Sequence, residues 1–354
     1  MEASKLSPRG KIETVMKKAS VIRPLSWLAI EFILLSFGPV SYKAFAADKL
    51  TGVYAAQSIS MSMPWIAQQA GLFRKYNLDF QLIYIASAPA VTAALLGGDA
   101  EVSVGGSVAI VRAFVQGATD LVFIGGVKNA LTQSILAKPE IRRPEDLKGK
   151  KIGITRIGSN THYFVIQALR QKGMEPGRDF SFIQIGGGPE TLAALVKGAI
   201  DAATLSPPVD AEAIAQGFHY VVHGPDLRIP YAAVILVTRR AVIAKRPQVV
   251  GRFMSVMAEA AKILHTDKEF TYKVLGKQLR VTDRKLLDAS YNAEIKVLEP
   301  RLDIRAEAIQ AMLEEISQTD PRARKVKPQD LIDRRYLDEM ETSGFFDQLW
   351  ASKR

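Results

Sequence analysis

The chain has 354 residues, of which 48% are hydrophobic. This is enough for two globular domains of ordinary size and excludes a disordered chain or a multi-span membrane protein. The formal net charge is +11, but basic and acidic residues are interspersed, as in Arg142-Arg143-Pro144-Glu145-Asp146. Such mixing is typical of a solvated surface and argues against nucleic-acid binding. The chain contains no cysteine, which excludes disulfides, thiol nucleophiles, zinc–cysteine sites and a lipidated N-terminal cysteine.

Residues 1–46 predict a secretory signal peptide. A basic segment precedes an apolar stretch over 25–40, and Ala44-Phe45-Ala46 supplies small residues at the two positions that a signal peptidase reads. Met16 fits this order better as a start residue than the first methionine does. Glu31 lies inside the apolar stretch, which leaves an uncleaved anchor helix as the alternative. We therefore expect a periplasmic protein, membrane-anchored if the segment is not cleaved.

Strands and helices alternate along the rest of the chain with short connections. Predicted strands form a first run and, after the polar connector 142–150, a second run: 50–55, 78–85, 101–104 and 121–124, then 151–155, 180–185, 201–205 and 220–222. Predicted helices between them begin at serine or proline: Pro64, Pro89, Ser107, Ser159, Pro189 and Pro208. This alternation predicts parallel, doubly wound sheets. An apolar strand over 232–238 and a helix from Pro247 follow, with Val250, Phe253, Met254 and Met257 on one face.

Two segments one hundred positions apart have nearly the same pattern. Residues 93–107 and 193–207 each resemble the end of an amphipathic helix, a glycine stop, a short strand and a loop of small residues. Two such units predict two α/β lobes of similar build with a cleft between them. We assign residues to the lobes as follows: 47–137 and 233–320 to lobe 1, 138–232 to an inserted lobe 2, and 321–354 to a C-terminal helical tail.

Four further segments carry a family resemblance through their order and spacing. They are PWIAQQAGLFRKYNL (64–78), ALLGGDAE (94–101), PEDLKGKKIG (144–153) and Gly158-Ser159. Over residues 48–265 the chain resembles the periplasmic substrate-binding proteins of nitrate/sulfonate/taurine-type ABC importers, which share the fold of the thiamine-pyrimidine synthesis and precursor-binding proteins. The resemblance implies an α/β, two-lobed periplasmic binding protein (type II) with doubly wound sheets and a ligand cleft between the lobes. It also implies delivery of the ligand to a membrane permease of an ABC importer. We expect a monomer that needs no cofactor.

The resemblance leaves alternatives open. One is an enzyme of the same fold acting on a pyrimidine or sulfur compound, but the pyrimidine-making relatives carry a cysteine-rich motif and the desulfinase relatives a catalytic cysteine, and this chain has neither. Another is a ligand-sensing subunit whose closed form docks on a receptor. The expected ligand is a small polar or anionic organic solute, sulfonate-, nitrate- or taurine-like or pyrimidine-like.

Candidate ligand residues lie in the loops after the predicted strands, because ligands of open α/β sheets bind at the carboxyl ends of strands. Ser107 and Ser159 begin predicted helices, where free N–H groups favour an anion, although each could serve only as an N-cap. Arg156 could pair with a carboxylate or sulfonate, or lie solvated at the rim. The predicted set is Ser58, Ser60, Met61, Ser87, Gly106, Ser107, Arg156, Ser159, Asn160, Thr161, Gly187 and Ser206. His219 and His223 would lie on one face of a strand, but no carboxylate or thiolate completes a set of metal ligands, although Asp226 is nearby, so no metal site is predicted.

Overall fold

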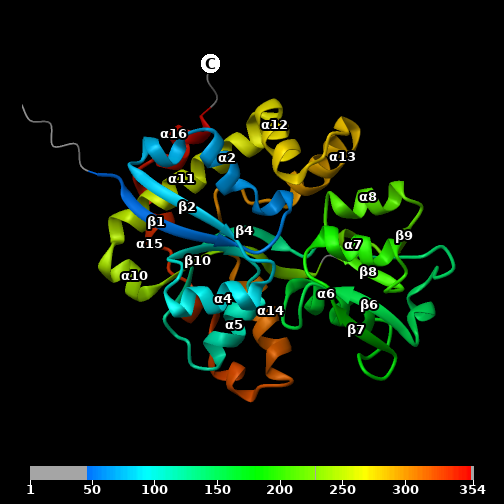
Figure 1. Cartoon of the computed structure of the whole chain (residues 1–354). Coiled ribbons are helices and arrows are strands. Elements are labelled where there is room, and N and C mark those ends of the chain that lie inside the picture. The colour runs from blue at the N-terminus through cyan, green and yellow to red at the C-terminus, as the bar shows by residue number, and fades with distance from the viewer. Residues whose placement is uncertain (1–45, 228, 352–354) are drawn as a thin grey trace, which may run out of the picture. The chain divides into compact units, whose positions relative to one another are not determined.

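The computed structural model describes residues 46–227 and 229–351, so the signal-peptide prediction falls outside the described residues. All the elements described below belong to the compact unit Ala47–Arg354. Their strands form two five-stranded sheets, which Figure 1 shows with the helices that cover them.

The first sheet has the strand order β2-β1-β3-β10-β4. Its members are β1 (Asp48–Tyr54), β2 (Leu78–Tyr84), β3 (Val102–Gly105), β4 (Leu121–Ala130) and β10 (Pro230–Arg239). Strand β1 is parallel to β2 and β3, whereas β10 is antiparallel to β3 and β4. All four residues of β3 are buried, as expected for a central strand covered on both faces.

The second sheet has the strand order β7-β6-β8-β5-β9. Its members are β5 (Ser134–Ala137), β6 (Lys150–Ile154), β7 (Phe180–Gln184), β8 (Ala202–Leu205) and β9 (His219–Val222). Strand β6 is parallel to β7 and β8, whereas β5 is antiparallel to β8 and β9. We call each sheet with its covering helices the first and the second lobe.

The α/β class with doubly wound sheets is confirmed, but the prediction of parallel sheets is wrong in one respect, because each sheet contains an antiparallel strand. Residues 134–137, expected at the end of lobe 1, pair instead within the second sheet as β5. Their sequence, Ser-Ile-Leu-Ala, is buried throughout. An apolar run of this length shows no periodicity that separates a strand from other core segments.

Two segments cross between the sheets. The first is residues 131–133, which join β4 to β5, and the second follows α9 (Gly224–Leu227) and leads into β10. Each crossing therefore enters the antiparallel strand of the next sheet. The crossings touch one another, because the Gly224 N–H donates to Ser134 Oγ at 3.1 Å.

Helices cover both faces of the sheets. Those that precede β10 are α2 (Met63–Gln69), α3 (Leu72–Lys75), α4 (Ala88–Gly97), α5 (Val108–Val115), α6 (Asn160–Arg170), α7 (Gly188–Val196) and α8 (Val209–Ala215). Those that follow β10 are α10 (Arg240–Lys245), α11 (Pro247–Thr266), α12 (Lys268–Leu279), α13 (Arg284–Glu294), α14 (Ala306–Ser317), α15 (Arg335–Thr342) and α16 (Phe345–Trp350). Short 3-10 segments are η1 (Ile59–Met61), η2 (Pro144–Leu147), η3 (Ile295–Val297), η4 (Pro321–Lys325) and η5 (Pro328–Leu331). Figure 1 shows α2 and α11 on one side of the first sheet and α4, α5 and α14 on the other.

The repeated pattern marks equivalent places in the two lobes. Helix α4 precedes β3, and α7 precedes β8, and these two strands hold the same third position in their sheets. The glycine stops are Gly98 at φ +85° and Gly198 at φ +72°. Both adopt the left-handed conformation that ends a helix at low cost only for glycine.

The C-terminal third of the chain completes the core of the first lobe. The predicted face of α11 is confirmed, because its four predicted side chains, Val250, Phe253, Met254 and Met257, are all fully buried. Residues 321–354, expected as an outer helical tail, contribute α15, which packs on β4 and α11, and α16, whose Phe346 is fully buried. Within residues 46–227 and 229–351, no helix is both long and apolar enough to cross a membrane.

Candidate ligand-binding cavity

A cavity of about 70 Å³ lies where the carboxyl ends of parallel strands from both lobes converge. Residues directly after β1, β3, β6 and β8 form part of its wall. This is the edge at which open α/β sheets bind ligands. The lining residues are Ala55, Ala56, Ser58, Ser60, Met61, Ser87, Ala88, Gly106, Lys128, Gln133, Thr155, Ser159, Asn160, Thr161, Ser206, Ala233 and Val234.

Nine of the twelve predicted ligand residues are in this wall. The first lobe contributes Ser58, Ser60, Met61, Ser87 and Gly106, and the second lobe contributes Ser159, Asn160, Thr161 and Ser206. Gly106 and Ser206 follow the equivalent strands β3 and β8, so the two repeated segments end at the same cavity.

The other three predicted residues do not line the cavity. The Ser107 hydroxyl is buried and donates to Met312 Sδ at 3.2 Å, which directs it into the core. The Arg156 side chain is exposed, because its loop turns outward before α6. Gly187 packs beside the Tyr84 hydroxyl, which would lie 2.9 Å from a Cβ at this position. The sequence predicted the loops in which these residues lie, but it did not predict the direction in which their side chains point.

The start of α6 presents a cluster of hydroxyl groups to the cavity. The prediction that Ser159 caps this helix is confirmed, because its Oγ accepts from the His162 N–H at 3.4 Å and donates to the Arg156 carbonyl at 2.7 Å. Thr161 Oγ1 lies 2.8 Å from Ser159 Oγ and accepts from the Thr155 N–H at 3.0 Å. These bonds fix the first turn of α6 against β6.

Helix starts from both lobes point toward the cavity. The Ser87 Oγ accepts from the Ala90 N–H at 3.3 Å and caps α4. The hydroxyl oxygens of Ser58 and Ser60 lie 3.1 Å apart at the start of η1. The first N–H groups of an α-helix have no acceptor in their own helix. The helix dipole also makes this end positive. Such an arrangement favours an anion.

Lys128 is the one charged side chain among the lining residues of the described chain. It is 3% exposed, and its Nζ donates to both carboxylate oxygens of Glu294 at 2.8 Å. Thr132 donates to the same carboxylate at 2.6 Å and also contacts Lys128. The buried pair therefore has no net charge. Lys128 is absent from the predicted set, although a lysine within the apolar run LVFIGGVKNA was a usable signal.

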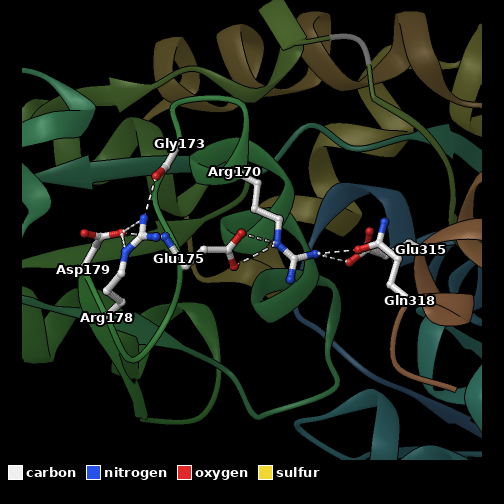
Figure 2. A network of polar contacts seen from close by, with 7 residues as sticks. All are labelled: Arg170, Gly173, Glu175, Arg178, Asp179, Glu315 and Gln318. Atoms are coloured by element: carbon white, nitrogen blue, oxygen red, sulfur yellow. Dashed lines mark hydrogen bonds and ion pairs between the residues drawn. The ribbon is translucent and has the colours of Figure 1, made fainter.

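The lobes contact one another at both ends of α6. Asn160 Nδ2, from the second lobe, donates to the Ala233 carbonyl of β10 at 2.7 Å. Farther along the same helix, Arg170 Nη1 donates to Glu315 of α14 at 2.7 Å, and the same guanidinium is also bonded to Glu175 (Figure 2). The structure thus places the two lobes in direct contact around the candidate site.

The two histidines of the sequence analysis have other partners. A ring nitrogen of His219 lies 2.7 Å from the Ile141 carbonyl, and His223 lies 3.1 Å from Asp226. Across 46–227 and 229–351, no group of three or more His, Asp or Glu side chains is arranged to hold a metal ion.

Two lobes of equivalent topology, joined by two crossings and sharing one polar cavity, define the periplasmic-binding-protein fold. A solved structure from Bordetella bronchiseptica RB50 matches with a TM-score of 0.74 at 22% identity, over 83% of this chain and 97% of that one. The alkanesulfonate-binding protein of Xanthomonas axonopodis pv. citri, solved with bound MOPS, matches with a TM-score of 0.68 at 19% identity, over 81% and 98%. The chain belongs to the NMT1/THI5 like family, whose profile matches residues 61–269.

A relative with an assigned ligand is more similar in sequence but matches over a shorter length. The taurine-binding periplasmic protein of Escherichia coli (strain K12) is 32% identical over 176 residues, which is 49% of this chain and 53% of that protein. The chain therefore spans about half the length of this relative. The fold also occurs in the desulfurization enzyme DSZB, with a TM-score of 0.62 and 14% identity over 84% of this chain and 99% of that one. Fold alone does not separate binding from catalysis.

Proposed function

We propose that this chain is the periplasmic solute-binding component of an ABC importer and that it captures a small organic sulfonate in the cavity between its lobes. The observation that carries the proposal is the convergence of helix starts and hydroxyl groups from both lobes on a small cavity whose wall contains no carboxylate. A sulfonate is an anion with three acceptor oxygens, which suits several N–H and O–H donors at once. The similarity to taurine- and alkanesulfonate-binding proteins supports the same ligand class.

Closure of the lobes provides the mechanism. Ser58, Ser60 and the start of α4 belong to the first lobe and the start of α6 to the second, so only the closed form brings both sets of polar groups to one ligand. A ligand that contacts both lobes stabilises the closed form by its differential affinity for that form. The closed form would then dock on the membrane permease and release the solute there.

Binding without catalysis is the function that the wall supports. The lining residues include no histidine and no carboxylate, and His162, which follows the Ser159 cap, contacts the Ser159 hydroxyl through its backbone N–H while its ring accepts from the Gly158 N–H at 3.2 Å. A hydroxyl nucleophile requires an adjacent general base. The wall therefore lacks the general base that a hydroxyl nucleophile would need in an enzyme acting on a pyrimidine or sulfur compound.

A thermal-shift and calorimetric panel tests the proposal on residues 47–354. We expect ethanesulfonate, taurine or isethionate to stabilise the protein, by about 2.7 kcal/mol at a hundredfold excess over Kd, and nitrate, acetate and pyrimidines to have little effect. Ser159→Ala should weaken sulfonate binding about tenfold, because it removes the cap that fixes the first turn of α6 at the cavity. Arg156→Ala is the matched control from the same loop, with an exposed side chain, and should bind normally. Stabilisation by a pyrimidine, with none by any sulfonate, would contradict the proposal.

A further inference from the structure

Gln133 is a buried polar side chain in the cavity wall whose amide oxygen is unused. The residue lies on the first crossing between the lobes and is 8% exposed. Its Oε1 has no hydrogen-bond partner among the described residues. Among the described residues that line the cavity, only Gln133 has a buried side-chain nitrogen or oxygen without a hydrogen-bond partner, which sets it apart.

The backbone around Gln133 holds the side chain in place. A Cβ on Gly224 would lie 1.7 Å from the Gln133 carbonyl oxygen, so the two crossings pack in contact at this point. The neighbouring Ser134 Oγ accepts from the Gly224 N–H at 3.1 Å. The backbone of Gln133 is therefore fixed beside the cavity, and its side chain forms part of the wall.

An unbonded buried carbonyl oxygen is costly and rare in native proteins. A hydrogen-bond donor in the cavity removes this cost when the ligand binds. The lining residues contain no carboxylate, so the acceptor for such a donor is an uncharged group, and the amide oxygen of Gln133 is the buried one without a partner among the described residues. An amide oxygen accepts equally from a hydroxyl or an ammonium group.

We propose that Gln133 determines specificity by accepting a hydrogen bond from the ligand, and that the ligand class is short sulfonates with a hydroxyl or ammonium group rather than plain alkanesulfonates. This inference rests on the proposed function and narrows it. The helix starts bind the anionic group, and Gln133 recognises the donor. The cavity of about 70 Å³ requires that both groups lie on a short chain.

Calorimetry with taurine, isethionate and ethanesulfonate tests the inference, because these ligands differ in the donor and share the anion. We expect the unmodified protein to bind taurine, isethionate or both about tenfold to a hundredfold more tightly than ethanesulfonate. Gln133→Met should remove this preference and leave ethanesulfonate affinity within about twofold. Gln133→Glu, which keeps an acceptor, should retain it. Gln167→Met is the matched control, since Gln167 also has a buried unbonded amide atom but lies outside the cavity wall.

Equal affinity of the unmodified protein for all three sulfonates would overturn this inference and leave the proposed function standing. Failure of every sulfonate to bind would overturn both. Even if Gln133→Met does not fold, the comparison of the three ligands on the unmodified protein still tests whether a sulfonate with a hydroxyl or ammonium group is preferred. If the preference persists in a folded Gln133→Met protein, Gln133 is not the acceptor and the inference fails.

Discussion

At the scale of single residues, the cavity wall contains helix starts and hydroxyl groups and no unpaired charge among the described residues. The one lining cation, Lys128, is neutralised by Glu294 at 2.8 Å in a buried pair. Removing one partner of such a pair leaves an uncompensated buried charge, which costs about 3–5 kcal/mol. Lys128 therefore has a structural role first, and the helix starts provide the favourable potential for the ligand.

Gly106 is a residue of the first lobe that the second lobe approaches closely. A Cβ here would lie 2.5 Å from Asn160 Oδ1, and Asn160 is held in place by its bond to the Ala233 carbonyl. We expect Gly106→Ala to displace Asn160, disfavour the closed form and weaken ligand binding by about tenfold, which corresponds to about 1.4 kcal/mol. Calorimetry with the best sulfonate of the panel measures the change.

Gly105→Ala is the control for this prediction. The nearest atom to its added Cβ would be Ala55 Cβ at 3.4 Å, which is an ordinary contact. The control should bind normally. If Gly106→Ala binds as tightly as the unmodified protein, the close approach of Asn160 does not govern closure.

Asp210 makes the stability of the protein depend on pH. Burial raises the pKa of its carboxyl from 3.8 to about 6, the charge of Glu294 acts in the same direction, and donation from the Ala211 N–H and the Tyr220 hydroxyl opposes the rise. The folded protein thus binds this proton more tightly than the unfolded chain does. The contribution of Asp210 to the free energy of unfolding is fully present below about pH 3.8 and is lost as the pH rises through about 6.

Asp210→Asn should therefore stabilise the protein near neutral pH, by up to about 2 kcal/mol at pH 7.5, and have little effect at pH 4. Urea unfolding at several pH values between these limits measures the difference. Asp79→Asn, at an exposed position of β2, is the control and should shift neither end of the curve. Parallel pH profiles for Asp210→Asn and the unmodified protein would contradict the assignment.

At the scale of elements, α6 links the cavity to the contact between the lobes. Its first turn, with Ser159 as the cap, lines the cavity, and Arg170 at its last residue bonds to Glu315 at 2.7 Å and Gln318 at 3.3 Å in and after α14. Figure 2 shows Arg170 between Glu175 of its own lobe and this pair from the first lobe. The helix is therefore held at both ends when the lobes are closed.

Arg170→Ala should shift the unliganded protein toward the open form and weaken sulfonate binding by about two- to fivefold. The effect is modest because Arg170 is 32% exposed and Glu315 15% exposed, and such pairs contribute about 0.2–1 kcal/mol. Small-angle scattering of the free protein should show a larger radius of gyration, and calorimetry the weaker binding.

Arg178→Ala is the matched control, because this arginine bonds only within the second lobe in Figure 2, to Asp179 and to the Gly173 carbonyl. Its removal should leave both the scattering and the affinity unchanged. An identical response of the two variants would show that the bond to α14 has no part in closure.

At the scale of the whole molecule, the two lobes have equivalent topology, and each contains a strand that the chain enters from the other lobe. Each sheet has the same arrangement of three neighbouring parallel strands, one antiparallel strand and a fifth at the edge. In each lobe the antiparallel strand follows a crossing from the other lobe. The lining residues Gln133, Ala233 and Val234 therefore lie on or beside the segments that connect the lobes.

The sequence by itself determined the features that depend on local physics. Alternating helices and strands, the cap at Ser159, the glycine stops at Gly98 and Gly198 and the loops that line the cavity all follow from propensity, capping and periodicity within a few residues. Nine of the predicted ligand residues lie in the cavity wall because these local signals located the loops that follow the strands.

Only the tertiary structure decided which residues distant in sequence meet, and where side chains point. Lys128 pairs with Glu294, which is 166 positions away, and Asn160 bonds to Ala233, which is 73 positions away. The antiparallel placement of β5, the inward turn of Ser107 and the outward turn of Arg156 likewise depend on packing between elements. A local pattern carries the propensity for a strand or a helix start, but the partner of each strand and the direction of each side chain are set by the free energy of the assembled core.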